Sequence, residues 1–149
     1  MLYKNYVEKY ARQIVKDNFD NAGLTKIRKI GYGSYGFVYE LKLDKHPHTV
    51  ALKVFRIKGQ CLKEVNALKT LKPYSTIPIP EVYQIIEATD TFSYDVVLMQ
   101  MMPGKNAFLD YLFKTVSKKK REAFARECVK CLLKIHAVKN PTYGPIENP

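Results

Sequence analysis

The chain has 149 residues, of which 46% are hydrophobic, and its 25 Lys and Arg outnumber its 14 Asp and Glu, giving a formal charge of +11. This length suffices for about one domain with a buried core, and the composition excludes a disordered tail. No apolar run reaches the roughly 18 residues that span a membrane, and the N-terminus lacks the apolar core of a signal peptide. We therefore expect a soluble cytoplasmic protein with no membrane partner. The densest basic run, at 114–122, is typical of a solvated segment, so we also expect no nucleic-acid partner.

The three cysteines are Cys61, Cys128 and Cys131, an odd number that favours reduced thiols. Cys128 and Cys131 form a C-x-x-C, but no second Cys or His pair stands at zinc-site spacing, and both lie in a helical pattern. We therefore expect buried thiols and no metal ligands.

The first predicted element is an amphipathic helix that ends near Asn18, because apolar residues recur at steps of three and four. A turn at 20–23 closes it. From Thr25 the apolar and polar residues alternate, through 25–33 and again through 37–44, as in strands with one buried face. The face of the second strand that is predicted to be buried carries Phe37, Tyr39, Leu41 and Leu43.

Residues 49–57 are rich in β-branched side chains and predict a third strand, so the first three strands form an antiparallel meander. Helical spacing returns at 59–72. The side of this helix that is predicted to face the core carries Cys61, Leu62, Val65, Leu68 and Leu71.

Two further strands are predicted at 77–89 and 92–102, joined by a short turn at 90–91. The first of them begins with two prolines, which exclude a helix there. Helical patterns follow at 107–116 and 121–138, ahead of a tail rich in Pro, Gly and Asn. The predicted fold class is α+β: a five-stranded antiparallel sheet with an inserted helix, preceded by an N-terminal helix and followed by further helices.

The stretch Gly31–Glu40, GYGSYGFVYE, has the spacing G-x-G-x-x-G, which different kinds of nucleotide site share. A dinucleotide fold requires a helix after the glycines and an acid about 20 residues further on. Here a strand follows, and positions 52–54 hold no acid. A Walker loop requires Lys and then Ser or Thr after the last glycine, whereas Phe and Val stand at 37–38.

The kinase pattern G-x-G-x-x-G-x-V is filled by Gly31, Gly33, Gly36 and Val38. The second kinase pattern, V-A-x-K, follows one strand later at 50–53. Glycines let backbone N–H groups approach phosphates with no side chain in the way. Val38 and Ala51 would cover a flat base, and Lys53, on the same strand face as Ala51, would reach the phosphates.

A lysine ammonium at the phosphates requires a carboxylate to hold it, and Glu64 is the only acid of the predicted helix at 59–72. We therefore predict that Lys53 and Glu64 form an ion pair. The alternative is a surface position for Glu64, paired with Lys63 or Lys69.

Taken in this order, the motifs resemble the aminoglycoside phosphotransferase and choline kinase group of kinase-fold enzymes, over residues 25–145. Besides the glycine loop and the lysine, the resemblance rests on IPIPEVY at 77–83, VVLMQMMPG at 96–104 and LLKIHAVKNPTYGPI at 132–146. The double-proline entry to the fourth strand distinguishes this pattern from that of protein kinases.

The resemblance implies three parts. Residues 1–24 are an N-terminal helix and turn, and 25–102 are a kinase-like N-lobe with the ATP-binding sheet and helix. Residues 103–149 are the exit from the hinge and the first helices of an incomplete C-lobe.

The resemblance also implies an ATP site in which Lys53 holds the α and β phosphates and Glu64 holds Lys53, as the two catalytic residues. The backbone of Gln100 and Met102 would pair with the adenine edge, and Leu98 would sit behind the base. The implied nucleotide-binding residues are Ile30, Gly31, Gly33, Ser34, Gly36, Val38, Ala51, Lys53, Leu98, Gln100 and Met102.

The implied reaction is transfer of the ATP γ-phosphate, with Mg²⁺, to a hydroxyl of a small substrate. The chain departs from the family because no His is followed two residues later by Asp, and His136 is interpreted as a packing residue at a helix end. The catalytic Asp and the metal ligands are expected beyond Pro149, so we expect an inactive fragment. The alternatives are a short protein that keeps the nucleotide lobe, a bacterial Ser/Thr protein kinase, and a noncatalytic nucleotide-binding or interaction module.

Overall fold

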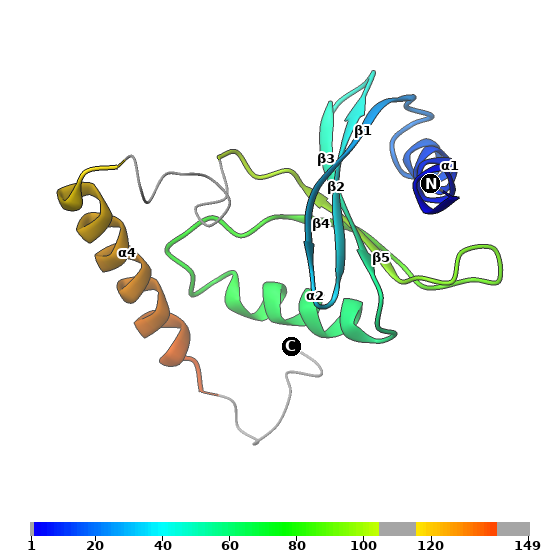
Figure 1. The fold of residues 1–149 in the computed structure, drawn as a ribbon. Coiled ribbons are helices and arrows are strands. Elements are labelled where there is room, and N and C mark those ends of the chain that lie inside the picture. Colours follow the sequence, from blue (N-terminus) through cyan, green and yellow to red (C-terminus); the bar gives the residue numbers. More distant parts are fainter. Residues whose placement is uncertain (1, 105–115, 140–149) are drawn as a thin grey trace. The chain divides into compact units, whose positions relative to one another are not determined.

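Five strands form an open antiparallel sheet in the computed structural model, which describes residues 2–104 and 116–139 (Figure 1). The strands are β1 (Leu24–Gly33), β2 (Gly36–Leu43), β3 (Thr49–Phe55), β4 (Val82–Ile86) and β5 (Val96–Gln100), in the spatial order β1-β2-β3-β5-β4. The helices are α1 (Leu2–Asn18), α2 (Gln60–Leu71) and α4 (Lys118–His136). The predicted α+β class, the helix at the N-terminus and the helix inserted after the third strand are therefore confirmed.

The chain divides into two compact units. The sheet unit comprises Met1–Val65 and Pro80–Met101, and the helical unit comprises Asn66–Ile79 and Met102–Pro149. The sheet unit thus holds α1, all five strands and the first turns of α2, as far as Val65.

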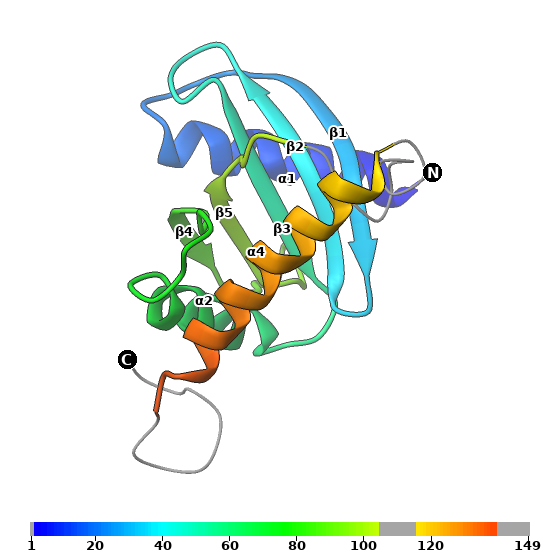
Figure 2. The same ribbon diagram turned by 90° about the vertical axis from the view of Figure 1, so that its left-hand side faces the viewer.

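One face of the sheet, the α1 face, is covered by α1 (Figure 2). Every second residue of β2 and β3 points into this core, as the alternation in the sequence predicts. The buried side chains from the strands are Leu24, Tyr39, Leu41, Leu43, Val50, Leu52, Val54, Val96 and Leu98. Val7, Ala11, Ile14 and Val15 of α1 pack on them, and the ring of Phe92 stacks on that of Tyr10 with centroids 3.8 Å apart.

The opposite face, the α2 face, carries a smaller core in which Ala51, Phe55, Val97 and Met99 of the sheet meet Cys61 and Val65 of α2. Leu62 was predicted to join this core, but 45% of its surface is exposed. The reason is geometric: Leu62 lies about 100° around the helix from Cys61, and only a narrow stripe of α2 meets the sheet.

The fourth and fifth strands are shorter than the predicted runs at 77–89 and 92–102, with five residues each. The two prolines at the start of the first run cannot donate to a strand ladder. Ahead of β5, the N–H of Thr89 donates to the carbonyl of Phe92 (2.8 Å) and the N–H of Phe92 to that of Thr89 (3.2 Å). This local turn contains the predicted turn at 90–91 and takes its flanking residues out of the sheet.

The helical unit contains α4, which confirms the helix predicted at 121–138. The helix predicted at 107–116 lies outside the described residues apart from Val116, and so does the tail beyond Lys139. All three cysteines are free; Cys61 and Cys131 are buried as predicted, whereas Cys128 is only half-buried. No helix in the described part of the chain combines the length and apolar character needed to cross a membrane.

Glu40 of β2 is a buried acid of the α2 face, with 9% of its surface exposed. The Nε–H of Arg28 donates to its Oε2 at 2.8 Å, and this hydrogen bond holds the pKa of the Glu40 carboxyl below its ordinary 4.5. Because folding favours the ionised form, the pair stabilises the protein above about pH 4.5, and this contribution is lost as pH falls through the lower pKa of the folded state.

Glu40→Gln should therefore lower the urea midpoint of unfolding at pH 7, and the difference from the wild type should shrink as the pH is lowered from 7 to 3. Urea titrations at a series of pH values measure this difference. A difference that stays constant over the whole range would contradict the stated origin of the pKa shift.

Candidate functional site

Lys53 and Glu64 meet on the α2 face. The ammonium of Lys53, on β3, donates to Oε2 of Glu64, which lies in the second turn of α2. The two side chains are 19% and 33% exposed, so the ion pair lies at the edge of the α2-face core rather than in free solvent. The ammonium also lies over the ring of Phe55, 4.9 Å from its centroid. The structure thus brings the two predicted catalytic residues into direct contact.

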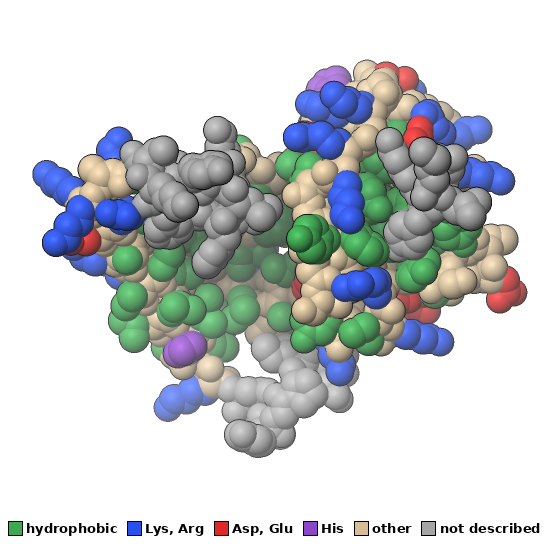
Figure 3. Space-filling view, in the orientation of Figure 1, with side chains coloured by type: hydrophobic (Ala, Val, Ile, Leu, Met, Phe, Trp, Pro, Cys, Tyr) green, Lys and Arg blue, Asp and Glu red, His purple; other side chains and the backbone are tan. Residues whose placement is uncertain are grey.

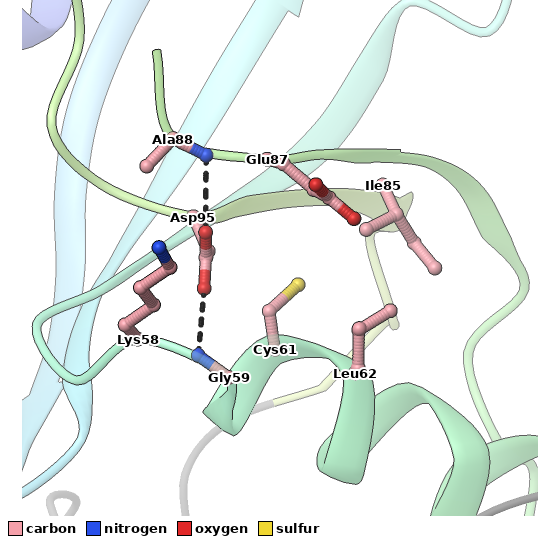
Figure 4. A pocket seen from close by; sticks show the side chains of 8 residues that line it. All are labelled: Lys58, Gly59, Cys61, Leu62, Ile85, Glu87, Ala88 and Asp95. Atoms are coloured by element: carbon pink, nitrogen blue, oxygen red, sulfur yellow. Dashed lines mark hydrogen bonds between the residues drawn. The ribbon is translucent and has the colours of Figure 1, made fainter. Parts of the chain in front are cut away.

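The start of α2 is fixed by Asp95, an 8% exposed carboxylate immediately ahead of β5. Its Oδ2 accepts the N–H of Gly59 and its Oδ1 accepts the N–H of Ala88, both at 3.0 Å (Figure 4). Gly59 has φ +79°, a conformation that favours glycine. A carboxylate at a helix N-terminus satisfies an unpaired N–H and complements the helix dipole. Asp95 therefore anchors the first turn of the helix that carries Glu64.

A cavity of about 180 Å³ opens beside this anchor (Figure 4). It is lined by Lys58, Gly59, Cys61, Leu62, Ile85, Glu87, Ala88 and Asp95. The Cys61 thiol lies 3.7 Å from the carbonyl of Val96, to which it donates. Burial, followed by the nearby charge of Asp95, raises the pKa of Cys61 to about 12, so this thiol stays protonated at neutral pH. Asp95 and Cys61 are thus already bonded within the protein, and the cavity marks the junction of α2 with the sheet.

The glycines of the β1–β2 hairpin differ in what surrounds them. A Cβ on Gly36 would collide with the carbonyl of Val54, so the close approach of β3 requires glycine at this position. A Cβ on Gly33 would meet open space, and one on Gly31 would make an ordinary contact with Val38 at 3.7 Å. Neither Gly31 nor Gly33 has a positive φ. Packing therefore accounts for Gly36 alone, and the other two leave a bare backbone that a ligand can approach.

Val38, Ala51, Lys53 and Met99 share the α2 face. In the strand register Val38 is the partner of Lys53, and Ala51 is the partner of Met99. Directly opposed residues of antiparallel strands point to the same side of a sheet. The two residues predicted to cover a base therefore lie on the side of the sheet where the ammonium of Lys53 lies.

Leu98 does not join them. It is fully buried in the α1-face core, opposite Leu52 in the strand register, so it cannot line a site on the face that carries Lys53. The next residue, Met99, has its side chain on the α2 face. Leu98 and Met99 are consecutive residues of β5, so their side chains point to opposite faces of the sheet.

The remaining predicted residues are distributed as follows. Ile30 is half-buried at an irregularity in the β1–β2 register, and Ser34 is exposed at the tip of the hairpin. The N–H of Gln100 already donates to the carbonyl of Glu81 at 2.7 Å, so the predicted contact of Gln100 with a base would use its carbonyl. Met102 belongs to the helical unit.

Asp95 and Met99 are not among the residues predicted from the sequence. Asp95 is a single acid directly ahead of the apolar run at 96–99. An acid in this position indicates a buried carboxylate that accepts hydrogen bonds within the protein. Its partner Gly59 lies 36 residues away, however, and no local pattern links the two.

Comparison with known proteins supports the fold. No family model matches the chain. A crystal structure from Ralstonia eutropha JMP134, described as a "putative aminoglycoside phosphotransferase", is similar with a TM-score of 0.63 at 14% sequence identity. The match covers 89% of this chain and 38% of that protein, so this chain spans well under half of its length. At this level of identity the similarity shows a kinase-like fold and no more.

Substitution by alanine should distinguish Gly36, which packing requires, from Gly33, which packing does not require. Gly36→Ala should lower the free energy of unfolding by about 1–3 kcal/mol, because the strand must shift to relieve the overlap with Val54. Gly33→Ala should change it by no more than about 0.5 kcal/mol, because the methyl group enters open space. Urea unfolding of the two variants measures the difference, and equal losses would show that the hairpin packs differently.

Proposed function

We propose that this chain is the nucleotide-binding part of an ATP-dependent phosphotransferase that acts on a hydroxyl group of a small molecule. The observation that carries the proposal is the contact between Lys53 and Glu64, on one face of an antiparallel sheet with a glycine hairpin at its edge. Kinase-fold enzymes use such a lysine–glutamate pair to hold the phosphates of ATP. The kinase-like fold supports the same conclusion.

In this proposal ATP binds on the α2 face. Lys53 donates to the α and β phosphates, and Glu64 keeps the ammonium in place through a charge-assisted hydrogen bond. Gly31 and Gly33 let the phosphates approach the hairpin backbone. The base lies against apolar side chains of the sheet, among them Ala51, and is held there by burial of its flat faces.

The reaction moves the γ-phosphoryl group: its bond to the β-phosphate oxygen breaks, and a bond to the hydroxyl oxygen of the acceptor forms. Kinase-fold enzymes use Mg²⁺ in this step. Within the described residues, no group of three or more His, Cys, Asp or Glu side chains is gathered that could hold a metal ion. The part that we assign to this chain is to bind and orient the nucleotide.

The class of acceptor that we propose is supported by the structural neighbour, whose description names an aminoglycoside phosphotransferase. Aminoglycosides are small molecules that carry hydroxyl groups, so we propose an acceptor of that general kind. A cytoplasmic location would give the site its supply of ATP.

The surface charge suits an anionic ligand. Figure 3 shows Lys and Arg side chains spread over the visible surface of the sheet unit rather than gathered in one groove. Lys26, Arg28 and Lys29 of β1 are all exposed, and the whole chain has a formal charge of +11. The electrostatic field of a positively charged surface raises the local concentration of anions such as ATP. A nucleic-acid interface would instead require basic side chains concentrated in one patch.

Lys53→Met should raise the dissociation constant of ATP by about 10–100-fold, because it removes a charge-assisted hydrogen bond to the phosphates. NMR titration of the chain with ATP and Mg²⁺ up to millimolar concentration measures the effect, with the backbone amides of Gly31, Gly33 and Lys53 as reporters. In the wild type these amides should shift and saturate.

Lys42→Met is the matched control, because Lys42 is an exposed lysine on the neighbouring strand β2 and its loss changes the net charge by the same amount. It should leave the dissociation constant within about threefold of the wild-type value. The proposed function fails if the wild-type amides do not respond to millimolar ATP, or if the two lysine variants lose affinity equally.

A further inference from the structure

Arg56, the residue that follows β3, holds the tip of the glycine hairpin. Its Nη2 donates to the carbonyls of Gly33 (2.6 Å) and Ser34 (3.1 Å). Its backbone N–H donates to the carbonyl of the next residue, Tyr35 (2.8 Å). A single residue, just beyond the end of β3, thus binds three consecutive carbonyls of the turn.

The backbone conformation of this turn is uncommon. Ser34 and Tyr35 are the two residues between the paired Gly33 and Gly36, and neither has a positive φ. Two-residue hairpins normally use turns with positive φ, because only those match the twist of the flanking strands. The backbone of this tip is therefore held in a less common conformation, and the hydrogen bonds from Arg56 stabilise it.

The same hydrogen bonds fix the direction of two N–H groups. In a trans peptide unit the C=O and the following N–H point in opposite directions. With the carbonyls of Gly33 and Ser34 bonded to the guanidinium, the N–H groups of Ser34 and Tyr35 point away from it.

The guanidinium lies on the α1 side of the hairpin. Its central carbon is 5.2 Å from the ring centroid of Phe37, and Phe37 packs against the α1-face core. Strand alternation agrees, because Arg56 is three residues beyond Lys53 and so falls on the other face. The guanidinium thus lies on the side of the hairpin opposite to the face that carries Lys53 and Glu64, and the two N–H groups point away from it.

From this geometry we propose that Arg56 is a positioning residue for the phosphate-binding hairpin. It does not touch the ligand; it turns the N–H groups of Ser34 and Tyr35 toward the polyphosphate of a bound nucleotide, on the same side as the ammonium of Lys53. This assignment rests on the proposed function. It implies that Arg56 affects the affinity for the phosphates and does not affect the affinity for the nucleoside.

The test compares ATP with adenosine, with Mg²⁺ in the buffer, by NMR titration of the whole chain. Arg56→Gln should raise the dissociation constant of ATP by about 10-fold, because the phosphates lose two oriented donors, and should change that of adenosine by no more than about twofold. Lys29→Gln is the matched control. Lys29 carries the same charge and lies over the same Phe37 ring, 4.2 Å from its centroid. Its loss should leave the dissociation constants of ATP and adenosine unchanged.

The outcomes separate the two proposals. If the wild type binds ATP but Arg56→Gln binds it as well as Lys29→Gln does, the assignment of Arg56 is overturned and the proposed function stands. A parallel loss of ATP and adenosine affinity also overturns it, because that result indicates a general loss of structure. If the wild type binds no ATP, both proposals fall. If Arg56→Gln does not fold, the same comparison can be made with Arg56→Lys. Lysine keeps one donor nitrogen on a shorter side chain.

Discussion

The contact between Lys53 and Glu64 depends on one constraint: β3 is the central strand of the sheet, and both of its faces are covered. Because side chains of a strand alternate, the residues at 50, 52 and 54 anchor β3 in the α1-face core, and the intervening residues point toward α2. Lys53 can reach the carboxylate of Glu64 only while this register holds. A shift of β3 by one residue would turn the lysine into the apolar core, where an unpaired ammonium is strongly disfavoured.

The segments around β3 extend this constraint to the hairpin and to α2. Directly after β3, Arg56 binds the carbonyls of the hairpin tip. Asp95, immediately ahead of β5, accepts the N–H of Gly59 at the start of α2. The carbonyl of Asp95 also accepts the N–H of Phe55, the last residue of β3. The end of the central strand therefore ties together the glycine hairpin and the helix that carries Glu64. This arrangement connects the three segments that carry the groups for which we propose a phosphate-binding role.

Local patterns predicted much of this arrangement. The alternation after Gly36 and the spacing of V-A-x-K are enough to place Ala51 and Lys53 on one face, because strands have a fixed period of two. The same rule fails for Leu98, since the run at 96–99 is apolar at every position and carries no signal for which residue faces which core. Asp95 and Arg56 could not be assigned because their partners lie 36 and 22–23 residues away, and only the folded chain brings them together.

The central claim, that the Lys53 ammonium is the phosphate contact of a nucleotide site, is tested most directly by chemical labelling with an acyl phosphate of ATP. Such a reagent transfers its acyl group to a lysine amine beside the bound phosphates and releases ATP. We predict that Lys53, 19% exposed, is acylated ahead of the more exposed lysines and that excess ATP protects it. Labelling of Lys53 that is slower than that of the exposed lysines, or that excess ATP does not reduce, would contradict it.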